Sequence, residues 1–245
     1  MTHPPPLNPE RDALFLDFDG TLTEIVTRPD DARLSPERAN RLSELAARMQ
    51  GALAILSGRP VSDLDVRLPR ALWRVGGHGA ETAAPGELAA TNSTTTAKAL
   101  ALTEVLRGVA ASLDGVQLEE KPTGAALHFR THPEAGPACS EAMRAAAGKV
   151  GGFEIQHGKM VVEARPVGVN KGEALARLMG MPAFRGRRPV MIGDDLTDEP
   201  AMHFAQTLGG LAIKVGAGHS CAGFRLHSPE DVHHWLGDAL APALR

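Results

Sequence analysis

Residues 14–25 read LFLDFDGTLTEI, and this stretch decides how the rest of the chain is interpreted. Its first residues are apolar, and Asp17 and Asp19 follow with Gly20 directly behind them. A short continuous apolar run is typical of a strand that is buried on both faces of a parallel sheet. Because alternate residues of an extended chain point to the same side, both aspartates can face one ligand while Phe18 points back into the core. Taken alone, the same residues would also fit an acidic turn.

Strand and helix patterns alternate on either side of this stretch, which predicts βαβ units and a doubly wound parallel sheet. In the next helix Ser35 can act as the capping residue and Pro36 occupies the first turn, and the apolar residues recur at helical spacing. The predicted strands of this part of the chain are 13–18, 52–58, 73–79, 188–195 and 211–216. The predicted helices are 34–51, 169–180, 197–206 and 228–240.

The middle of the chain has a different pattern. Two helical segments each precede a pair of strand-like segments, which predicts an antiparallel sheet with helices on one face. One helix ends near Leu113 and the other spans about 133–149, and the strands are expected at 116–122, 125–130, 153–158 and 160–166. We therefore expect an inserted α+β cap domain at 89–166 and an α/β core built from 1–88 and 167–245.

The overall composition is that of an ordinary globular protein. Of the 245 residues, 43% are hydrophobic and 22% are charged, and the formal net charge is −3. A chain without an excess of basic residues has no global field that would attract nucleic acid or an anionic membrane. Cys139 and Cys221 lack the spacing of a zinc site or a disulfide framework. The polar, Pro-rich start and the lack of any run of about 18 apolar residues predict a cytoplasmic protein without a signal peptide or a membrane span.

Polar residues follow the predicted core strands at the point where each strand ends. Ligands of open α/β sheets bind beyond the carboxyl ends of the strands, so we expect these residues at one edge of the sheet. They are Asp17, Asp19, Thr21, Ser57, Asp194, Asp195 and Asp198. Two carboxylates about 4 Å apart repel each other by roughly 4 kcal/mol at an effective dielectric constant near 20, so the cluster favours a bound cation. Oxygen ligands without His or Cys indicate Mg²⁺.

Each of these residues has a simpler interpretation when it is taken singly. Asp17 or Asp19 could belong to a turn. Asp198 could favour a helix N-terminus, and Ser57 could be a turn hydroxyl. Lys171 does not fit such a list, because a cation in the first turn of a helix opposes the helix dipole. A lysine there is better explained if it faces an anion, and the joint occurrence of these features favours a functional site.

The segments DFDGTLT, LSGR and GDDLTDE, together with Lys171, resemble the four motifs of the haloacid dehalogenase (HAD) superfamily of phosphatases, in the same order. The resemblance implies a HAD-like, Rossmannoid core. By that resemblance Asp17 is the nucleophile that takes the phosphoryl group, and Asp19 is the general acid and then the general base. Ser57 and Lys171 would hold the phosphoryl oxygens. The implied Mg²⁺ ligands and supporting residues are Asp17, Asp19 through its backbone carbonyl, Asp194, Asp195 and Asp198.

The segments GGHGAE, EEKPTGAALHFR, GKMVVEARPVGVNKG and IGDDLTDEPAM resemble trehalose-6-phosphate phosphatases over about residues 12–237. On periodicity alone, the charged residues of the middle segment fit a solvated sheet face. The resemblance implies instead that some of them contact the sugar, so that the cap sets the substrate specificity. These implied substrate-binding residues are Glu119, Lys121, Arg130, Lys159 and Glu163.

The resemblance implies a Mg²⁺-dependent enzyme that hydrolyses trehalose 6-phosphate to trehalose and phosphate through an aspartyl-phosphate. A phosphatase acting on sucrose 6-phosphate or mannosyl-3-phosphoglycerate is the alternative within this class. A non-catalytic HAD-like binding or regulatory protein is the alternative outside it. The expected partner is a small sugar phosphate, with neither nucleic acid nor membrane. Functional pairing with a trehalose-6-phosphate synthase would follow from the activity, although no segment of the sequence reads as a docking site for it.

Overall fold

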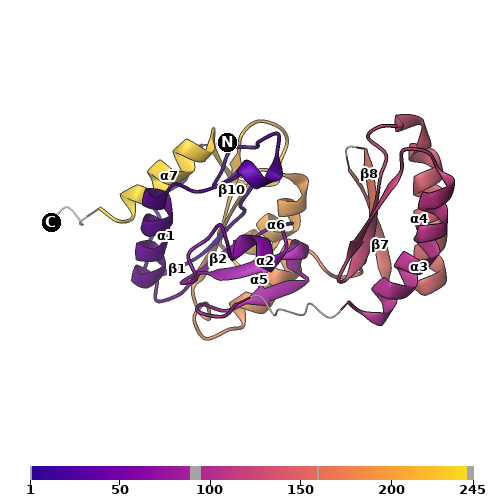
Figure 1. Cartoon of the computed structure of the whole chain (residues 1–245). Helices are drawn as coiled ribbons and strands as arrows, with labels where there is room; N and C mark the ends of the chain where they lie inside the picture. The colour runs from indigo at the N-terminus through magenta and orange to yellow at the C-terminus, as the bar shows by residue number, and fades with distance from the viewer. Residues whose placement is uncertain (1, 89–94, 159, 242–245) are drawn as a thin grey trace. The chain divides into compact units, whose positions relative to one another are not determined.

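The computed structural model describes residues 2–88, 95–158 and 160–241. The chain divides into two compact units, Met1–Thr91 with Asn170–Arg245, and Asn92–Val169 (Figure 1). The second unit is therefore inserted between two segments of the first. Each unit has its own cluster of buried apolar side chains. No helix of the described residues is both long enough and apolar enough to cross a membrane.

In the part of the first unit that the structure describes, seven strands form one sheet in the order β11-β10-β9-β1-β2-β3-β4. They are β1 (Asp12–Leu16), β2 (Leu53–Leu56), β3 (Trp73–Gly76), β4 (Glu81–Ala83), β9 (Arg188–Gly193), β10 (Leu211–Val215) and β11 (Phe224–Leu226). All neighbouring strands are parallel except β3 and β4. The predicted parallel α/β core is confirmed.

β1 lies in the middle of this sheet, and its register explains its apolar sequence. Leu14 pairs with Leu53 of β2 on one side and with Val190 of β9 on the other. Every residue of β1 is buried, as expected of a strand that is covered on both faces. Because β1, β2, β9 and β10 run parallel, their carboxyl ends lie at the same edge of the sheet.

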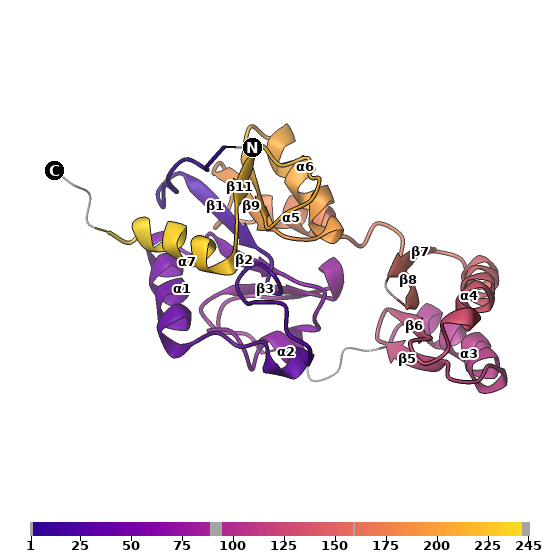
Figure 2. The same ribbon diagram turned by 90° about the horizontal axis from the view of Figure 1, so that it is seen from above.

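Helices cover both faces of the sheet (Figures 1 and 2). α1 (Pro36–Arg48) and α7 (Pro229–Asp238) contact each other, as do α5 (Lys171–Met179) and α6 (Glu199–Thr207). Three of these helices have an N-cap residue directly before their first residue: Ser35, Asn170 and Ser228. The side chain of each accepts a hydrogen bond from the backbone N–H three residues later. Such caps satisfy donors that have no partner within the helix. The arrangement is the doubly wound one that the sequence predicted.

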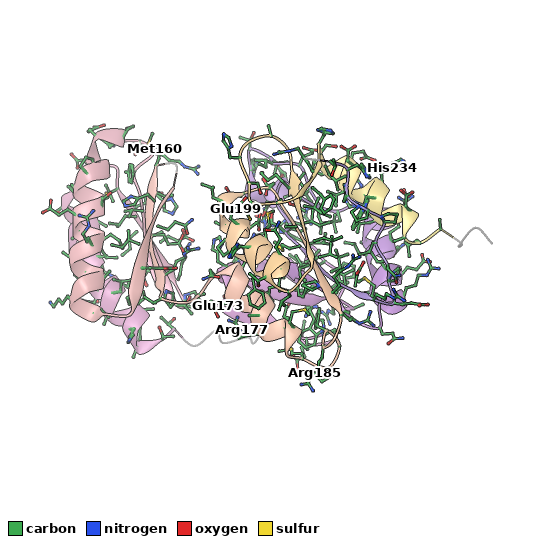
Figure 3. All side chains as sticks on the ribbon, turned by 180° about the vertical axis from the view of Figure 1, so that it is seen from behind. Met160, Glu173, Arg177, Arg185, Glu199 and His234 are labelled. Carbon is green, nitrogen blue, oxygen red and sulfur yellow. The ribbon has the colours of Figure 1, made fainter. Side chains whose placement is uncertain are left out.

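Arg177 fixes the start of α5 beside the end of β3. Its Nη2 donates to the backbone carbonyl of Gly79 at 2.6 Å, and Figure 3 labels this side chain. Gly79 has a φ of +119°, and a Cβ there would lie 2.8 Å from the carbonyl oxygen of Asn170. The glycine is therefore required for the close approach. As a result, Lys171, the first residue of α5, lies at the edge of the sheet where the strands end.

The short elements that were not predicted from the sequence include α2 (Val61–Leu64), β4 and β11. Each has only three or four residues, which is too short for a periodic pattern. β4 exists because it pairs antiparallel with β3, and β11 because it pairs with β10. The helix expected to begin at 197 starts as a 3₁₀ turn, Leu196–Asp198, and becomes α-helical at Glu199.

Within its described residues, the inserted unit is a four-stranded antiparallel sheet with two helices packed against one face (Figure 1). Its elements are α3 (Ala97–Ser112), β5 (Gln117–Lys121), β6 (Gly124–His128), α4 (Gly136–Val150), β7 (Phe153–Gly158) and β8 (Val161–Pro166). Leu118, Leu127 and Val162 belong to or pack against the apolar cluster beneath the helices. Strand alternation places Glu119 and Glu163 on the opposite face.

Candidate active site

The chain turns sharply directly after β1. Asp17 extends the strand by donating its backbone N–H to the carbonyl of Ile192 at 3.0 Å. Gly20 then adopts a φ of +79°, and its N–H donates to the carbonyl of Thr23 at 2.8 Å. A Cβ at Gly20 would overlap the carboxylate of Asp194. The glycine therefore permits both the left-handed backbone and the approach of Asp194 to the end of β1.

Lys171 joins two buried aspartates. Its Nζ donates to Oδ1 of Asp17 at 2.5 Å and to Oδ1 of Asp198 at 2.6 Å. Lys171 is 2% exposed, Asp17 is 5% exposed and Asp198 is fully buried. Charges at such depth are stable only when they are paired. The lysine that opposes the dipole of its own helix is thus held by carboxylates from two other segments.

Asp198 also organises the loop that follows β9. Its Oδ2 accepts hydrogen bonds from the backbone N–H groups of Asp194 and Asp195, each at 3.0 Å. The side chain of Asp195 caps the 3₁₀ turn that follows, since its Oδ1 accepts a hydrogen bond from the N–H of Leu196 at 2.6 Å. Lys214 of β10, which the sequence reasoning missed, donates its Nζ to the backbone carbonyl of Asp194.

Among the described residues, Asp17, Asp194 and Asp198 form a group in which each offers one carboxylate oxygen, and these three oxygens lie within 4.8 Å of one another. The carboxylate of Asp195, predicted to support the metal, does not belong to this group, and Asp19 was predicted there only through its backbone carbonyl. Three oxygen donors without nitrogen or sulfur suit a hard divalent cation such as Mg²⁺. Lys171 supplies one positive charge to three carboxylates, so a cation would further reduce their repulsion. The residues present therefore fit the Mg²⁺ ion that the sequence predicts.

The pKa values of the site reflect this crowding. Burial raises the pKa of Asp17 well above its ordinary value, and Asp198 and Asp194 raise it further while Lys171 opposes the shift. Burial also raises the pKa of Asp194 to about 6, with added repulsion from Asp198 and Asp195. Burial alone would lower the pKa of Lys171, but Asp17 and Asp198 outweigh it and raise that pKa, so the ammonium stays charged.

Ser57 follows the end of β2 at the same edge of the sheet and is 1% exposed. Its backbone N–H donates to the carbonyl of Val75 at 2.9 Å, and its Oγ accepts the backbone N–H of Arg59 at 3.1 Å. A hydroxyl that accepts one bond can still donate its own hydrogen. Ser57 is therefore built into the loop at its predicted edge, with a donor suited to a phosphoryl oxygen.

The structure adds Arg59, the last residue of the LSGR segment, which was not predicted as a site residue. Its Nε and Nη2 donate to the two carboxylate oxygens of Asp19, each at 2.6 Å. Its Nη1 donates to Oδ2 of Asp63 at 2.7 Å. These hydrogen bonds to Asp19 and Asp63 raise the pKa of Arg59. Both carboxylate oxygens of Asp19 thus accept hydrogen bonds from Arg59.

Several predicted sugar-binding residues lie together on the open face of the inserted sheet. Glu119 and Glu163 both pair in register with Ala126 of β6, one from each side. Lys121 donates its Nζ to Oε1 of Glu163 at 2.8 Å, and Nε2 of His128 lies 2.8 Å from Oε2 of Glu119.

A concavity of about 430 Å³ within this unit is lined by Glu119, His128, Arg130 and neighbouring residues. The predicted residue Arg130 therefore lines the same concavity as Glu119. Of the five residues expected to contact the sugar, Lys159 lies outside the described residues.

Known proteins share both the sequence and the fold. The sequence model of the family described as Trehalose-phosphatase matches residues 15–230. A probable trehalose-phosphate phosphatase of Sinorhizobium fredii is 39% identical over 206 residues, which is 83% of this chain and 77% of that protein. The trehalose-6-phosphate phosphatase of Escherichia coli K12 is 37% identical over 240 residues, which is 96% of this chain and 90% of that protein.

A solved structure agrees with these relatives. The trehalose-6-phosphate phosphatase of Aspergillus fumigatus, in its crystal form 3, superposes with a TM-score of 0.72 at 28% identity. The match covers 96% of this chain and 98% of that one. The family resemblance of the sequence motifs is confirmed over nearly their whole span, and the chain belongs to the trehalose-phosphatase family.

Proposed function

We propose that the protein is a Mg²⁺-dependent phosphatase that hydrolyses trehalose 6-phosphate to trehalose and phosphate through an aspartyl-phosphate. The observation that carries the proposal is Lys171 bonded to Asp17 and Asp198 at 2.5 and 2.6 Å, at the sheet edge where Asp194 also lies. A buried carboxylate held by an ammonium, with two further carboxylates beside it, suits the transfer of an anionic phosphoryl group. In such transfers positioning and charge neutralisation supply most of the catalysis.

In the first step an oxygen of Asp17 attacks the phosphorus atom. The bond between phosphorus and the sugar oxygen breaks, its electron pair stays on that oxygen, and Asp19 in its acid form supplies the proton. Lys171 and Ser57 hold the phosphoryl oxygens through N–H and O–H donors. Trehalose leaves, and Asp17 carries the phosphoryl group as a mixed anhydride.

In the second step the ionised Asp19 takes a proton from a water molecule, and the water oxygen attacks the phosphorus. The bond from phosphorus to the Asp17 oxygen breaks and returns the electron pair to the carboxylate. Phosphate leaves, and Asp19 again holds the proton that the next cycle uses. Asp19 therefore acts as the general acid in the first step and as the general base in the second, and it regains its proton at the end of the cycle.

The side chains that would hold Mg²⁺ are Asp17, Asp194 and Asp198, supported by their mutual distances and oxygen chemistry. When bound, the ion supplies positive charge that neutralises the phosphoryl oxygens. The backbone carbonyl of Asp19 and the side chain of Asp195 remain proposals from the family resemblance. Asp195 would act through the loop that it caps, given its bond to Leu196.

We assign the choice of sugar to the inserted unit, with 1–88 and 167–245 as the catalytic core. Glu119, Lys121 and Glu163 support this assignment because they lie on the sheet face that the helices leave open. Lys121 is hydrogen-bonded to Glu163, and Glu119 is hydrogen-bonded to His128. Carboxylates and ammonium groups of this kind can bond sugar hydroxyls. Arg130 belongs to the same proposal because it lines the same concavity as Glu119, whereas Lys159 belongs to it from the resemblance alone. A cytoplasmic location and pairing with a trehalose-6-phosphate synthase stay predictions from the sequence.

A phosphate-release panel tests the proposal. Trehalose 6-phosphate, sucrose 6-phosphate and mannosyl-3-phosphoglycerate are each assayed with Mg²⁺ and with EDTA, using the wild type and Asp17→Asn. We expect release from trehalose 6-phosphate with Mg²⁺ and none from the folded Asp17→Asn variant. Faster release from either other sugar phosphate would replace the substrate, and full activity of the variant would refute the nucleophile. A wild type that binds these compounds without releasing phosphate would favour a non-catalytic binding protein.

A further inference from the structure

The carboxylate of Asp19 is fixed from one side by a planar, two-pronged contact. Nε of Arg59 lies 2.6 Å from Oδ2 and Nη2 lies 2.6 Å from Oδ1 of that aspartate. Two parallel N–H···O bonds determine the plane and the direction of a carboxylate, which a single bond or a point charge does not. The contact thus restrains the rotation of the side chain about its own axis.

Arg59 is itself held in place, so the restraint is transmitted to the fold. Its Nη1 donates to Asp63 at 2.7 Å, and the guanidinium carbon lies 5.4 Å from the centre of the Phe18 ring. Asp63 is fixed in turn by Arg67, whose Nη2 and Nε donate to its two oxygens at 2.8 and 2.9 Å. Arg67 also donates to the backbone carbonyl of Ala32.

We infer that Arg59 is a positioning residue that aims the carboxylate of Asp19 at the oxygen of the departing group. This inference rests on the proposed function, in which Asp19 moves the protons. Arg59 forms no bond to the phosphorus and exchanges no proton in either step. It acts through the orientation of Asp19, backed by the chain of contacts from Asp63 to Arg67.

The sheet contains a matched pair for comparison at its other end. Nε of Arg188 donates to Oδ1 of Asp12 at 2.8 Å, and its Nη2 donates to Oδ2 at 3.0 Å. Asp12 begins β1, whereas Asp19 follows its end. The two arginine–aspartate pairs share their chemistry and differ in their distance from the site. Arg188→Met therefore controls for the loss of such a pair from this fold.

The test compares kcat/KM for two kinds of substrate. Release of trehalose needs a proton on the departing oxygen, whereas 2,4-dinitrophenyl phosphate releases a stable phenolate without one. Asp19→Asn should therefore lower kcat/KM for trehalose 6-phosphate by about 10²–10⁴-fold and change that for the activated ester much less. Arg59→Met should show the same substrate-dependent pattern, with a loss of about 10²-fold for the sugar phosphate. Arg59→Lys should recover part of the loss, because it restores one of the two bonds.

The double variant Asp19→Asn/Arg59→Met separates positioning from a structural role. If Arg59 acts through Asp19, the double variant is no slower than Asp19→Asn alone, so the two losses are not additive. Additive losses, or equal losses of Arg59→Met on both substrates, would overturn the inference. So would Arg188→Met reproducing the pattern, or Arg59→Lys and Arg59→Met both keeping wild-type rates on the sugar phosphate. If Arg59→Met does not fold, Arg59→Lys and its double variant with Asp19→Asn decide in its place.

Failure of the proposed substrate is distinguishable from failure of this inference. Glucose 6-phosphate is run beside trehalose 6-phosphate as a second alkyl phosphate. If the wild type releases phosphate from glucose 6-phosphate but not from trehalose 6-phosphate, the substrate assignment is wrong. The kcat/KM values of the Arg59 variants are then compared on glucose 6-phosphate. If the wild type releases phosphate from none of trehalose 6-phosphate, glucose 6-phosphate and 2,4-dinitrophenyl phosphate, both the proposed function and the role of Arg59 are refuted.

Discussion

Lys171→Met should strongly destabilise the first unit when no divalent cation is present. The methionine fills most of the space of the lysine stem but leaves the carboxylates of Asp17 and Asp198, which are 5% and 0% exposed, without their ammonium partner. Removing one member of a buried ion pair costs about 3–5 kcal/mol, because a buried charge stays behind without compensation. We expect a loss of this size in the free energy of unfolding.

Urea unfolding followed by tryptophan fluorescence measures this loss in the unit concerned. The chain has two tryptophans, Trp73 in β3 and Trp235 in α7, and both belong to the first unit. At a slope of about 2 kcal/mol per M, the expected loss lowers the urea midpoint by about 1.5–2.5 M. The measurement is made in EDTA at neutral pH. Arg33→Met, which removes a cation from an exposed position of the first unit, is the control and should stay within about 0.5 kcal/mol of wild type.

Two further results are expected for Lys171→Met, because its carboxylates lack a positive partner. Mg²⁺ should restore part of the stability, since a cation held by Asp17, Asp194 and Asp198 replaces some of the lost positive charge. Acid should also reduce the difference in stability between the variant and the wild type, because the raised pKa values of Asp17 and Asp194 let these carboxyls take up protons in the folded state at a higher pH than in the unfolded chain. A Lys171→Met midpoint within about 0.3 M of wild type in EDTA would refute the reasoning about the buried charges.

Three other changes test separate parts of the molecule. Asp194→Asn should raise the Mg²⁺ concentration for half-maximal phosphate release by more than about tenfold, the loss typical of disturbing even an outer partner of a metal ligand; an unchanged Mg²⁺ titration would remove this residue from the metal site. Glu163→Ala should lower kcat/KM for trehalose 6-phosphate by about 10–100-fold, the range for a lost hydrogen bond to a charged group, and affect a small aryl phosphate far less. Glu154→Ala, which removes a carboxylate paired with Arg165 on the same sheet, is its control, and equal losses on both substrates would contradict the assignment. Burial lowers the pKa of His233 below its ordinary value of 6.5, so its contribution to stability is complete above about pH 6.5 and is lost as the pH falls through the lowered value; His233→Gln should flatten that part of the stability profile, and an unchanged profile would rule the histidine out.

The parallel core could be predicted because its strands are long enough to show a pattern. The run from Ala13 to Leu16 is apolar at every position because β1 lies between two strands and under two layers of helices. The starts of α1 and α5 could be predicted from the capping residues Ser35 and Asn170, because each cap bonds a backbone N–H only three residues later in the sequence. β4 and β11 carry no comparable signal, because three residues form a strand only where a neighbouring strand offers its edge.

The site divides in the same way between local and distant causes. Asp17 was predictable because the motif that contains it is contiguous, and Lys171 because its charge opposes the helix that carries it. Lys214 was not, because its hydrogen bond to the carbonyl of Asp194 joins strand β10 to the loop after β9. A buried lysine in the run LAIKV is a local irregularity in an apolar strand, and that irregularity was the available signal.

Arg59 shows what a known sheet register adds to a motif. Asp19 and Arg59 are 40 positions apart in sequence, and neither residue type requires the other. Leu16 of β1 pairs with Ile55 of β2, so two parallel strands end side by side, and the loops that leave them must pass close together. A carboxylate placed three residues beyond Leu16 then meets a guanidinium placed four residues beyond Ile55. The pairing follows from the order of β1 and β2 in the sheet, and the kinetic coupling expected between Asp19 and Arg59 is a consequence of that order.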